Sequence, residues 1–121
     1  MGFDVTTSLR NRLQSGVCTG IFSKTLDSAF VEAAGYAELD FIILDTEHGP
    51  AGWETIHNHV RAAQMTNMAP LVRVRGLDAQ AIGAALDSGA EGVQVPNISS
   101  AEEAAEAVAA ARFHPMGERG V

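Results

Sequence analysis

The sequence predicts an α/β protein built on a parallel sheet, because two patterns alternate along the chain. Short apolar runs occur at residues 17–22, 41–44, 70–74 and 92–95, and an alanine-rich segment with helical periodicity follows each of them. Strand–helix units that repeat every ~20–30 residues are typical of parallel sheets with helical crossovers. Four such units fit either an open doubly wound sheet or half of an eight-stranded barrel, which needs about 250 residues.

Helices are expected before the first strand and after each strand in turn, at residues 7–13, 26–34, 53–65, 79–86 and 101–112. Gly35 and Gly89 follow two of these segments, where a left-handed helix end is expected. Asp78 is placed to cap the helix at 79–86, and Ser99 with Glu102 is expected to form a capping box for the last helix. The apolar strands predict burial on both faces of the sheet.

The composition excludes several classes of protein. With 46% hydrophobic and 19% charged residues the chain can bury a core. Its 15 acidic and 8 basic side chains give a formal net charge of -7, which argues against a nucleic-acid partner. Cys18 is the only cysteine, so no internal disulfide is expected. No apolar run approaches the ~20 residues of a membrane span. A cytoplasmic location is therefore expected.

The strongest chemical signal follows the strand at 41–44, where Asp45 and His48 precede a Gly-Pro turn. Since side chains alternate along a strand, Asp45 shares a face with Phe41 and Ile43, and His48 can return beside it. A carboxylate that accepts one imidazole N–H fixes the tautomer and makes the other nitrogen a better base. The alternative is that Asp45 caps a loop and His48 is a surface histidine. The carboxyl end of a βα strand favours the catalytic interpretation.

The second signal is Arg73, which lies inside an apolar strand and shares a face with Leu71 and Arg75. A buried guanidinium is costly unless it meets an anion. It is expected either to hold a substrate carboxylate or to pair with a carboxylate of the chain such as Asp45 or Glu47. Arg75 lies nearer the rim, where a solvated or ion-paired side chain is expected.

Weaker signals come from other residues near strand ends. Glu47 is expected to face a metal-bound water or a neighbouring donor, or to be solvated. Phe22, at the end of the first strand, lines a pocket or belongs to the core. His57 and His59 lie two apart on a helix and do not share a face, which predicts two solvated side chains. An amide at Gln94 is open to orienting a neighbour or to binding water or substrate.

Taken together in their order, these residues resemble the HpcH/HpaI aldolase family. The two specific segments are an Asp-x-Glu-His step and a closing Pro-x-Gly-x-Arg-Gly segment. The series that carries the resemblance is Gly20-Ile21-Phe22-Ser23, Asp45-Thr46-Glu47-His48, Leu71-Val72-Arg73, Val95-Pro96 and Arg112-Phe113-His114-Pro115-Met116-Gly117-Glu118-Arg119-Gly120.

The resemblance implies a (β/α)8 barrel of the TIM type, with residues 1–121 as the N-terminal half of one barrel domain. It implies a homo-oligomer, usually a hexamer, and a divalent metal such as Mg, Mn or Co. Asp45 and His48 match the family's catalytic dyad, and Arg73 matches the arginine that contacts the 2-oxo acid. The two carboxylate ligands of the metal come from later strands in the family, so they are expected beyond Val121.

The expected function is that of a metal-dependent (class II) aldolase, a carbon–carbon lyase that splits or forms 4-hydroxy-2-oxo acids to give pyruvate and an aldehyde. Lys24 is the only lysine and no lysine is expected at a strand's end, which disfavours a Schiff-base mechanism. Two alternatives remain open. One is another lyase or a hydrolase that acts through a pyruvate enolate with the same dyad. The other is a half-barrel without activity.

Overall fold

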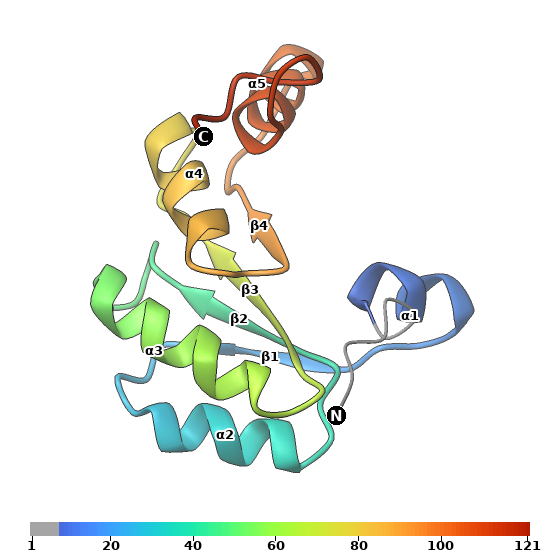
Figure 1. Ribbon diagram of the computed structural model, residues 1–121, viewed down its shortest axis with the longest axis vertical. Coiled ribbons are helices and arrows are strands. Elements are labelled where there is room, and N and C mark those ends of the chain that lie inside the picture. The colour runs from blue at the N-terminus through green and yellow to red at the C-terminus, as the bar shows by residue number, and fades with distance from the viewer. Residues whose placement is uncertain (1–7) are drawn as a thin grey trace.

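The computed structural model describes residues 8–121 and shows a four-stranded, fully parallel sheet with the strand order β1-β2-β3-β4 (Figure 1). The helices follow one another along the sheet from α2 to α5, while α1 lies apart from them (Figure 1). The elements are α1 (Leu9–Ser15), β1 (Gly20–Ser23), α2 (Ser28–Tyr36), β2 (Phe41–Asp45), α3 (Trp53–Gln64), β3 (Ala69–Arg73), α4 (Ala79–Asp87), β4 (Gly92–Gln94) and α5 (Ala101–Ala111).

The alternation predicted from the sequence is confirmed for every strand and helix between residues 8 and 121, with ends that shift by up to three residues. The expected helix at 7–13 corresponds to α1, although Thr7 lies outside the described residues. The α1 helix lies near the amino-terminal ends of the strands. There the backbone N–H of Leu9 donates to Glu91 and the guanidinium of Arg12 to Asp40, at 3.1 and 3.4 Å.

The predicted N-cap of α4 is confirmed, and the N-cap of α5 lies one residue later than predicted. The side chain of Asp78 accepts the N–H of Gln80 at 3.0 Å and caps α4 as expected. The predicted capping box of Ser99 and Glu102 is wrong by one position. Ser100 is the N-cap of α5 and accepts the N–H of Glu103 at 3.1 Å. The spacing of the motif is unchanged, because either serine has a glutamate three residues later.

The two glycines expected at helix ends have different roles. Gly89 has a φ of +96°, so it adopts the left-handed conformation expected after α4. Gly35 does not, because α2 continues past it to Tyr36 and a left-handed residue comes only at Glu38, with φ 69°. Gly35 is instead a site of close packing, since a Cβ there would overlap the side chain of Thr66.

The hydrophobic core lies between the sheet and the helices. Ile42, Leu44 and Val72 point toward it and are at most 1% exposed. Helix α3 packs on β2 and β3, and α4 packs on β4. The opposite face is covered less. Phe22 is 50% exposed and Leu71 is half-buried. The expectation of burial on both faces is met only in part for residues 8–121, since Ile43 on this face is 8% exposed but the helices cover the other face.

His59 is buried in α3, at 2% exposure, which corrects the prediction of a solvated side chain. It shares the core-facing stripe of α3 with Ile56, Val60 and Ala63, a spacing of three and four residues that the sequence contained. Its Nε2 atom has no hydrogen-bond partner among the described residues. A buried polar atom without a partner costs about 1–3 kcal/mol.

We therefore expect His59→Leu, which removes that atom at similar volume, to raise the free energy of unfolding by about 1 kcal/mol. Urea unfolding followed by circular dichroism measures it. His57→Leu, two residues away and less buried, is the control and should change stability little. A lower stability for His59→Leu than for the control would contradict this account.

Candidate active site at the carboxyl ends of β2 and β3

Asp45 and Arg73 are the last residues of neighbouring strands, and they are paired in register. The parallel arrangement therefore brings a carboxylate and a guanidinium together at one edge of the sheet. Nη2 of Arg73 donates to Oδ2 of Asp45 at 2.7 Å, and Nε donates to Oδ1 at 3.1 Å. This two-point contact matches the planar fork of arginine to the carboxylate. An ion pair with Asp45 was one of the two roles predicted for Arg73 from the sequence.

The Asp45 carboxylate also organises the loop that follows β2. Its Oδ1 atom accepts the backbone N–H groups of Glu47 at 3.0 Å and His48 at 3.1 Å. The side chain is 0% exposed. The pKa of Asp45 is lowered to about 2, mainly by the hydrogen bond from Arg73 and also by the two backbone N–H groups, against the opposing effect of burial. The same contact raises the pKa of Arg73. Asp45 is thus an anion under all ordinary conditions.

We expect part of the protein's stability to be lost in acid through Asp45. Its pKa is about 2 in the folded state and 3.8 in a model peptide, so the unfolded state binds a proton more readily. The stabilisation is therefore complete above about pH 4 and is lost as the pH falls through about 2. Urea unfolding of the wild type and Asp45→Asn between these pH values tests this. The difference between their unfolding free energies should shrink toward acid. A constant difference would contradict it.

The imidazole of His48 contacts Glu47, where a contact with Asp45 was expected. His48 Nε2 lies 3.1 Å from Glu47 Oε1, while Asp45 binds only the backbone N–H of His48. Glu47 Oε1 also lies 3.5 Å from Nε of Arg73, so it stands between the imidazole and the guanidinium. The His48 side chain is 62% exposed, and that of Glu47 only 15%. Of the alternatives for Glu47, the neighbouring-donor one is realised.

Phe22 joins the site from β1. The guanidinium carbon of Arg73 lies 4.7 Å from the centroid of the Phe22 ring, within the range of cation–π contacts. Among residues 8–121 the ring is half exposed, and it borders the site. Thr46 contacts two arginines at the edge of the site. Its carbonyl accepts Nε of Arg75 at 3.0 Å, and its hydroxyl donates to the carbonyl of Arg73 at 2.7 Å.

Other candidate residues lie outside this cluster or at its margin. Gln94 is paired in register with Arg73 and is exposed, but no contact joins the two side chains. Lys24 follows the last residue of β1 directly, because β1 extends to Ser23. Lys24 lies in the loop that begins there, as expected. Its loop is adjacent to the loop after β2, since a Cβ added to Gly49 would lie 3.6 Å from the Cα of Lys24.

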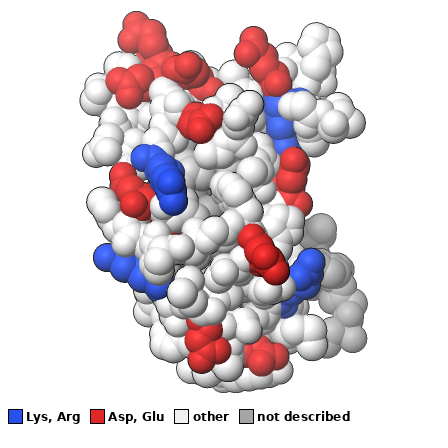
Figure 2. All heavy atoms as spheres, turned by 90° about the vertical axis from the view of Figure 1, so that its left-hand side faces the viewer, with Lys and Arg blue, Asp and Glu red and all other residues white. Residues whose placement is uncertain are grey.

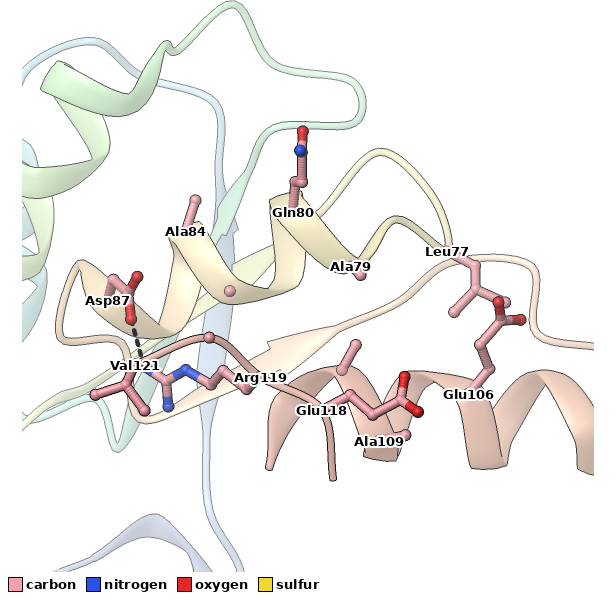
Figure 3. A pocket seen from close by; sticks show the side chains of 13 residues that line it. Leu77, Ala79, Gln80, Ala84, Asp87, Glu106, Ala109, Glu118, Arg119 and Val121 are labelled. Atoms are coloured by element: carbon pink, nitrogen blue, oxygen red, sulfur yellow. Dashed lines mark hydrogen bonds and ion pairs between the residues drawn. The ribbon is translucent and has the colours of Figure 1, made fainter. Parts of the chain in front are cut away.

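A large hollow, of about 580 Å³, lies away from this cluster, between α4, α5 and the C-terminal segment (Figure 3). Arg119 points across it to Asp87, with Nη2 and Oδ1 at 2.6 Å (Figure 3). Its helix walls consist largely of small side chains such as Ala84 and Ala109. It shares no residue with the Asp45–Arg73 cluster.

On the face shown in Figure 2, the Lys and Arg side chains are few and separated by acidic ones, which provides no basic track for nucleic acid. Within residues 8–121, no group of three or more His, Cys, Asp or Glu side chains is arranged to hold a metal ion. No helix in that range is long and apolar enough to cross a membrane.

The family model of the HpcH/HpaI aldolase/citrate lyase family matches residues 18–121. The chain belongs to this family. The match covers the whole of the sheet and includes every residue of the cluster around Asp45. The HpcH/HpaI membership predicted from the sequence is thereby confirmed.

The curated relatives of the HpcH/HpaI chain include several aldolases. The 2-dehydro-3,6-dideoxy-6-sulfogluconate aldolase of Pseudomonas putida is 37% identical, over 84% of this chain and 40% of the relative. The 4-hydroxy-2-oxo-heptane-1,7-dioate aldolase of Salmonella arizonae is 34% identical, over 91% of this chain and 40% of the relative. The chain therefore spans about two fifths of the length of these curated relatives.

The fold is shared with solved structures as well. The crystal structure of citrate synthase SbnG matches with a TM-score of 0.88 and 34% identity, over 95% of this chain and 47% of that one. The predicted fold class, a TIM-type barrel of which four βα units are present here, is confirmed by such neighbours together with the parallel sheet. Since four strands are half of a barrel of eight, residues Phe22, Leu71 and Arg73 lie on the face that corresponds to the barrel interior.

Proposed function

We propose that this chain supplies the acid–base part of an aldolase that cleaves or forms 4-hydroxy-2-oxo acids, with pyruvate and an aldehyde as the products of cleavage. The observation that carries the proposal is the cluster of Asp45, Glu47, His48 and Arg73 at the carboxyl edge of β2 and β3. That edge is where enzymes with parallel βα barrels carry their chemistry. The aldolase relatives support the same reaction class.

His48 and Arg73 have different roles in the proposed reaction. His48, the most exposed member, takes the proton from the 4-hydroxyl group of the substrate. As that O–H bond breaks, the oxygen forms the aldehyde C=O, the C3–C4 bond breaks, and its electron pair passes to C3 to give the enolate of pyruvate. Proton transfer to C3 completes the cleavage, and the reverse sequence forms the bond.

Arg73 positions the 2-oxo acid and stabilises the negative charge that develops on it. Its Nε and Nη2 atoms are held by Asp45, and Phe22 covers one face of the guanidinium. Nη1 makes no hydrogen bond or ion pair among residues 8–121 and is the nitrogen left for a substrate oxygen. Asp45 keeps this orientation, and Phe22 and Glu47 border the space that the substrate enters.

The expected divalent metal, Mg, Mn or Co, belongs to the proposal as well. The described residues do not form a metal site of their own, since Asp45 is taken up by Arg73 and two N–H groups, and no group of three ligands exists. His48 and Arg73 are therefore the contribution of the described residues to the steps above. When bound, such an ion would supply Lewis-acid chemistry to a 2-oxo acid.

The experiment is an assay of pyruvate release from a series of 4-hydroxy-2-oxo acids by the catalytically competent protein. We expect release that stops on treatment with EDTA and returns on addition of Mn²⁺. Activity that is unchanged by EDTA would contradict the metal role. Inactivation by borohydride in the presence of pyruvate would instead indicate a Schiff base on a lysine. Hydrolysis of esters without any pyruvate release would favour the hydrolase alternative.

One alternative has a specific observation in its favour. Citrate synthase SbnG, whose structure matches this chain, is named as a synthase and not as an aldolase. Another lyase of the pyruvate-enolate type, with the same His48 and Arg73, would therefore retain this geometry with a different partner for the enolate.

We further propose a soluble, cytoplasmic homo-oligomer, hexameric as the family resemblance implies, that acts on small molecules and binds neither nucleic acid nor membranes.

A further inference from the structure

Lys24 stands at the carboxyl edge of the sheet, beside the residues of the candidate site. Strand β1 ends at Ser23, which is paired in register with Leu44. The residues that follow these two, Lys24 and Asp45, therefore stand at the same level of the sheet. Asp45 is in turn paired with Arg73. Since neighbouring strands lie about 4.8 Å apart, the backbone of Lys24 is about 10 Å across the sheet from that of Arg73.

The alternation of side chains in β1 directs Lys24 toward the face that carries Arg73. Ile21 packs against the core, and Ser23 is 5% exposed. Phe22 lies on the opposite face, where its ring covers the guanidinium of Arg73. Because successive side chains of an extended segment point to opposite faces, Lys24 points the same way as Phe22. Its side chain is exposed at the rim of the site.

The ammonium group of Lys24 makes no hydrogen bond or ion pair among residues 8–121. The neighbouring carboxylates contact other donors. Asp45 accepts Arg73 and two backbone N–H groups, and Glu47 contacts His48 and Arg73. An ammonium on a flexible four-carbon stem is a compact charge that adapts to the position of an anion. Lys24, the only lysine of the chain, is thus left for an anion of the substrate.

The strand order places three functional groups in succession across this edge. Arg73 belongs to β3, His48 follows β2, and Lys24 follows β1. In the proposed reaction Arg73 holds the 2-oxo acid end of the substrate and His48 meets the 4-hydroxyl group. Lys24 is therefore next to the part of the substrate beyond C4, which leaves as the aldehyde.

We propose that Lys24 is a specificity residue, whose ammonium group binds an anionic group, such as a carboxylate, at the far end of the substrate. This inference rests on the proposed function, which fixes the direction in which the substrate lies. It narrows the substrate class to 4-hydroxy-2-oxo acids that carry a second negative charge beyond C4.

Two six-carbon acids without a 4-hydroxyl group, 2-oxoadipate and 2-oxohexanoate, test this without turnover. They differ only at C6, which is a carboxylate in the first and a methyl group in the second. Isothermal titration calorimetry of the catalytically competent protein with Mn²⁺ measures both affinities. We expect the wild type to bind 2-oxoadipate at least about tenfold more tightly, because a hydrogen bond between charged groups contributes that much. Lys24→Gln should bind the two acids about equally, and Lys24→Arg should retain the preference.

Arg10→Gln is the matched control, because it removes one exposed positive charge from α1, near the amino-terminal ends of the strands. It should retain the wild-type preference. Equal binding of the two acids by the wild type, or an unchanged preference in Lys24→Gln, would overturn the role of Lys24 and leave the aldolase proposal standing. A wild type that binds neither acid would contradict the proposed 2-oxo acid site itself, and this inference with it.

Discussion

Replacing His48 by alanine should lower kcat for pyruvate release by about 10²- to 10⁴-fold, because a general base contributes that much to proton transfer. The imidazole is 62% exposed and packs against little besides Glu47, so its loss should leave the fold intact. KM should change little, since Arg73 still holds the 2-oxo acid. The measurement is steady-state kinetics of the catalytically competent protein, together with urea unfolding of the same variant.

His57→Ala on α3 is the control for the removal of a histidine, because its side chain lies outside the cluster. It should retain wild-type kcat. Turnover of His48→Ala at the wild-type rate would remove His48 from the mechanism. A loss of activity that accompanies a large loss of stability would show that the side chain is structural.

Replacing Asp45 by alanine should lower the free energy of unfolding by about 2–4 kcal/mol, because the fully buried carboxylate accepts four hydrogen bonds, two of them from a guanidinium. The loop that carries Glu47 and His48 would lose its anchor at the same time. We therefore expect the activity to fall as well. Urea unfolding at pH 7 measures the first effect, and kcat and KM measure the second.

Asp87→Ala is a matched control for this variant. Asp87 pairs with Arg119 at 2.6 Å, as close as Asp45 to Arg73, but its side chain is 67% exposed. Exposed ion pairs contribute at most about 1 kcal/mol, so the control should change stability much less. Equal losses for the two variants would show that burial does not strengthen the Asp45 contact.

Much of the fold was predictable, since it depends on signals that are local in the chain. The apolar run at 41–44 and the helical spacing of 53–65 correspond to β2 and α3 with little change at their ends. The capping motif of α5 was recognised but placed one residue early, because two consecutive serines precede two consecutive glutamates. Gly35 was misassigned because its role depends on Thr66, which is distant in the chain and close in space.

The sequence predicted which residues form the candidate site, but only some of the contacts between them. Asp45, His48 and Arg73 were found because polar residues follow apolar strands, and the carboxyl ends of parallel strands meet at one edge. Phe22 was left open between pocket and core, and its exposure depends on which face the helices cover. His59 had the spacing of a core residue, but its polar type favoured the wrong interpretation.

The sequence by itself determined the succession of strands and helices and the polar residues at the strand ends, because periodicity and strand-end position are properties of neighbouring residues. Only the tertiary structure decided that Arg73 takes the oxygens of Asp45 and that Glu47 meets His48. A carboxylate has few acceptor sites, and which donors reach them depends on the register of β2 with β3 and on the path of the following loop.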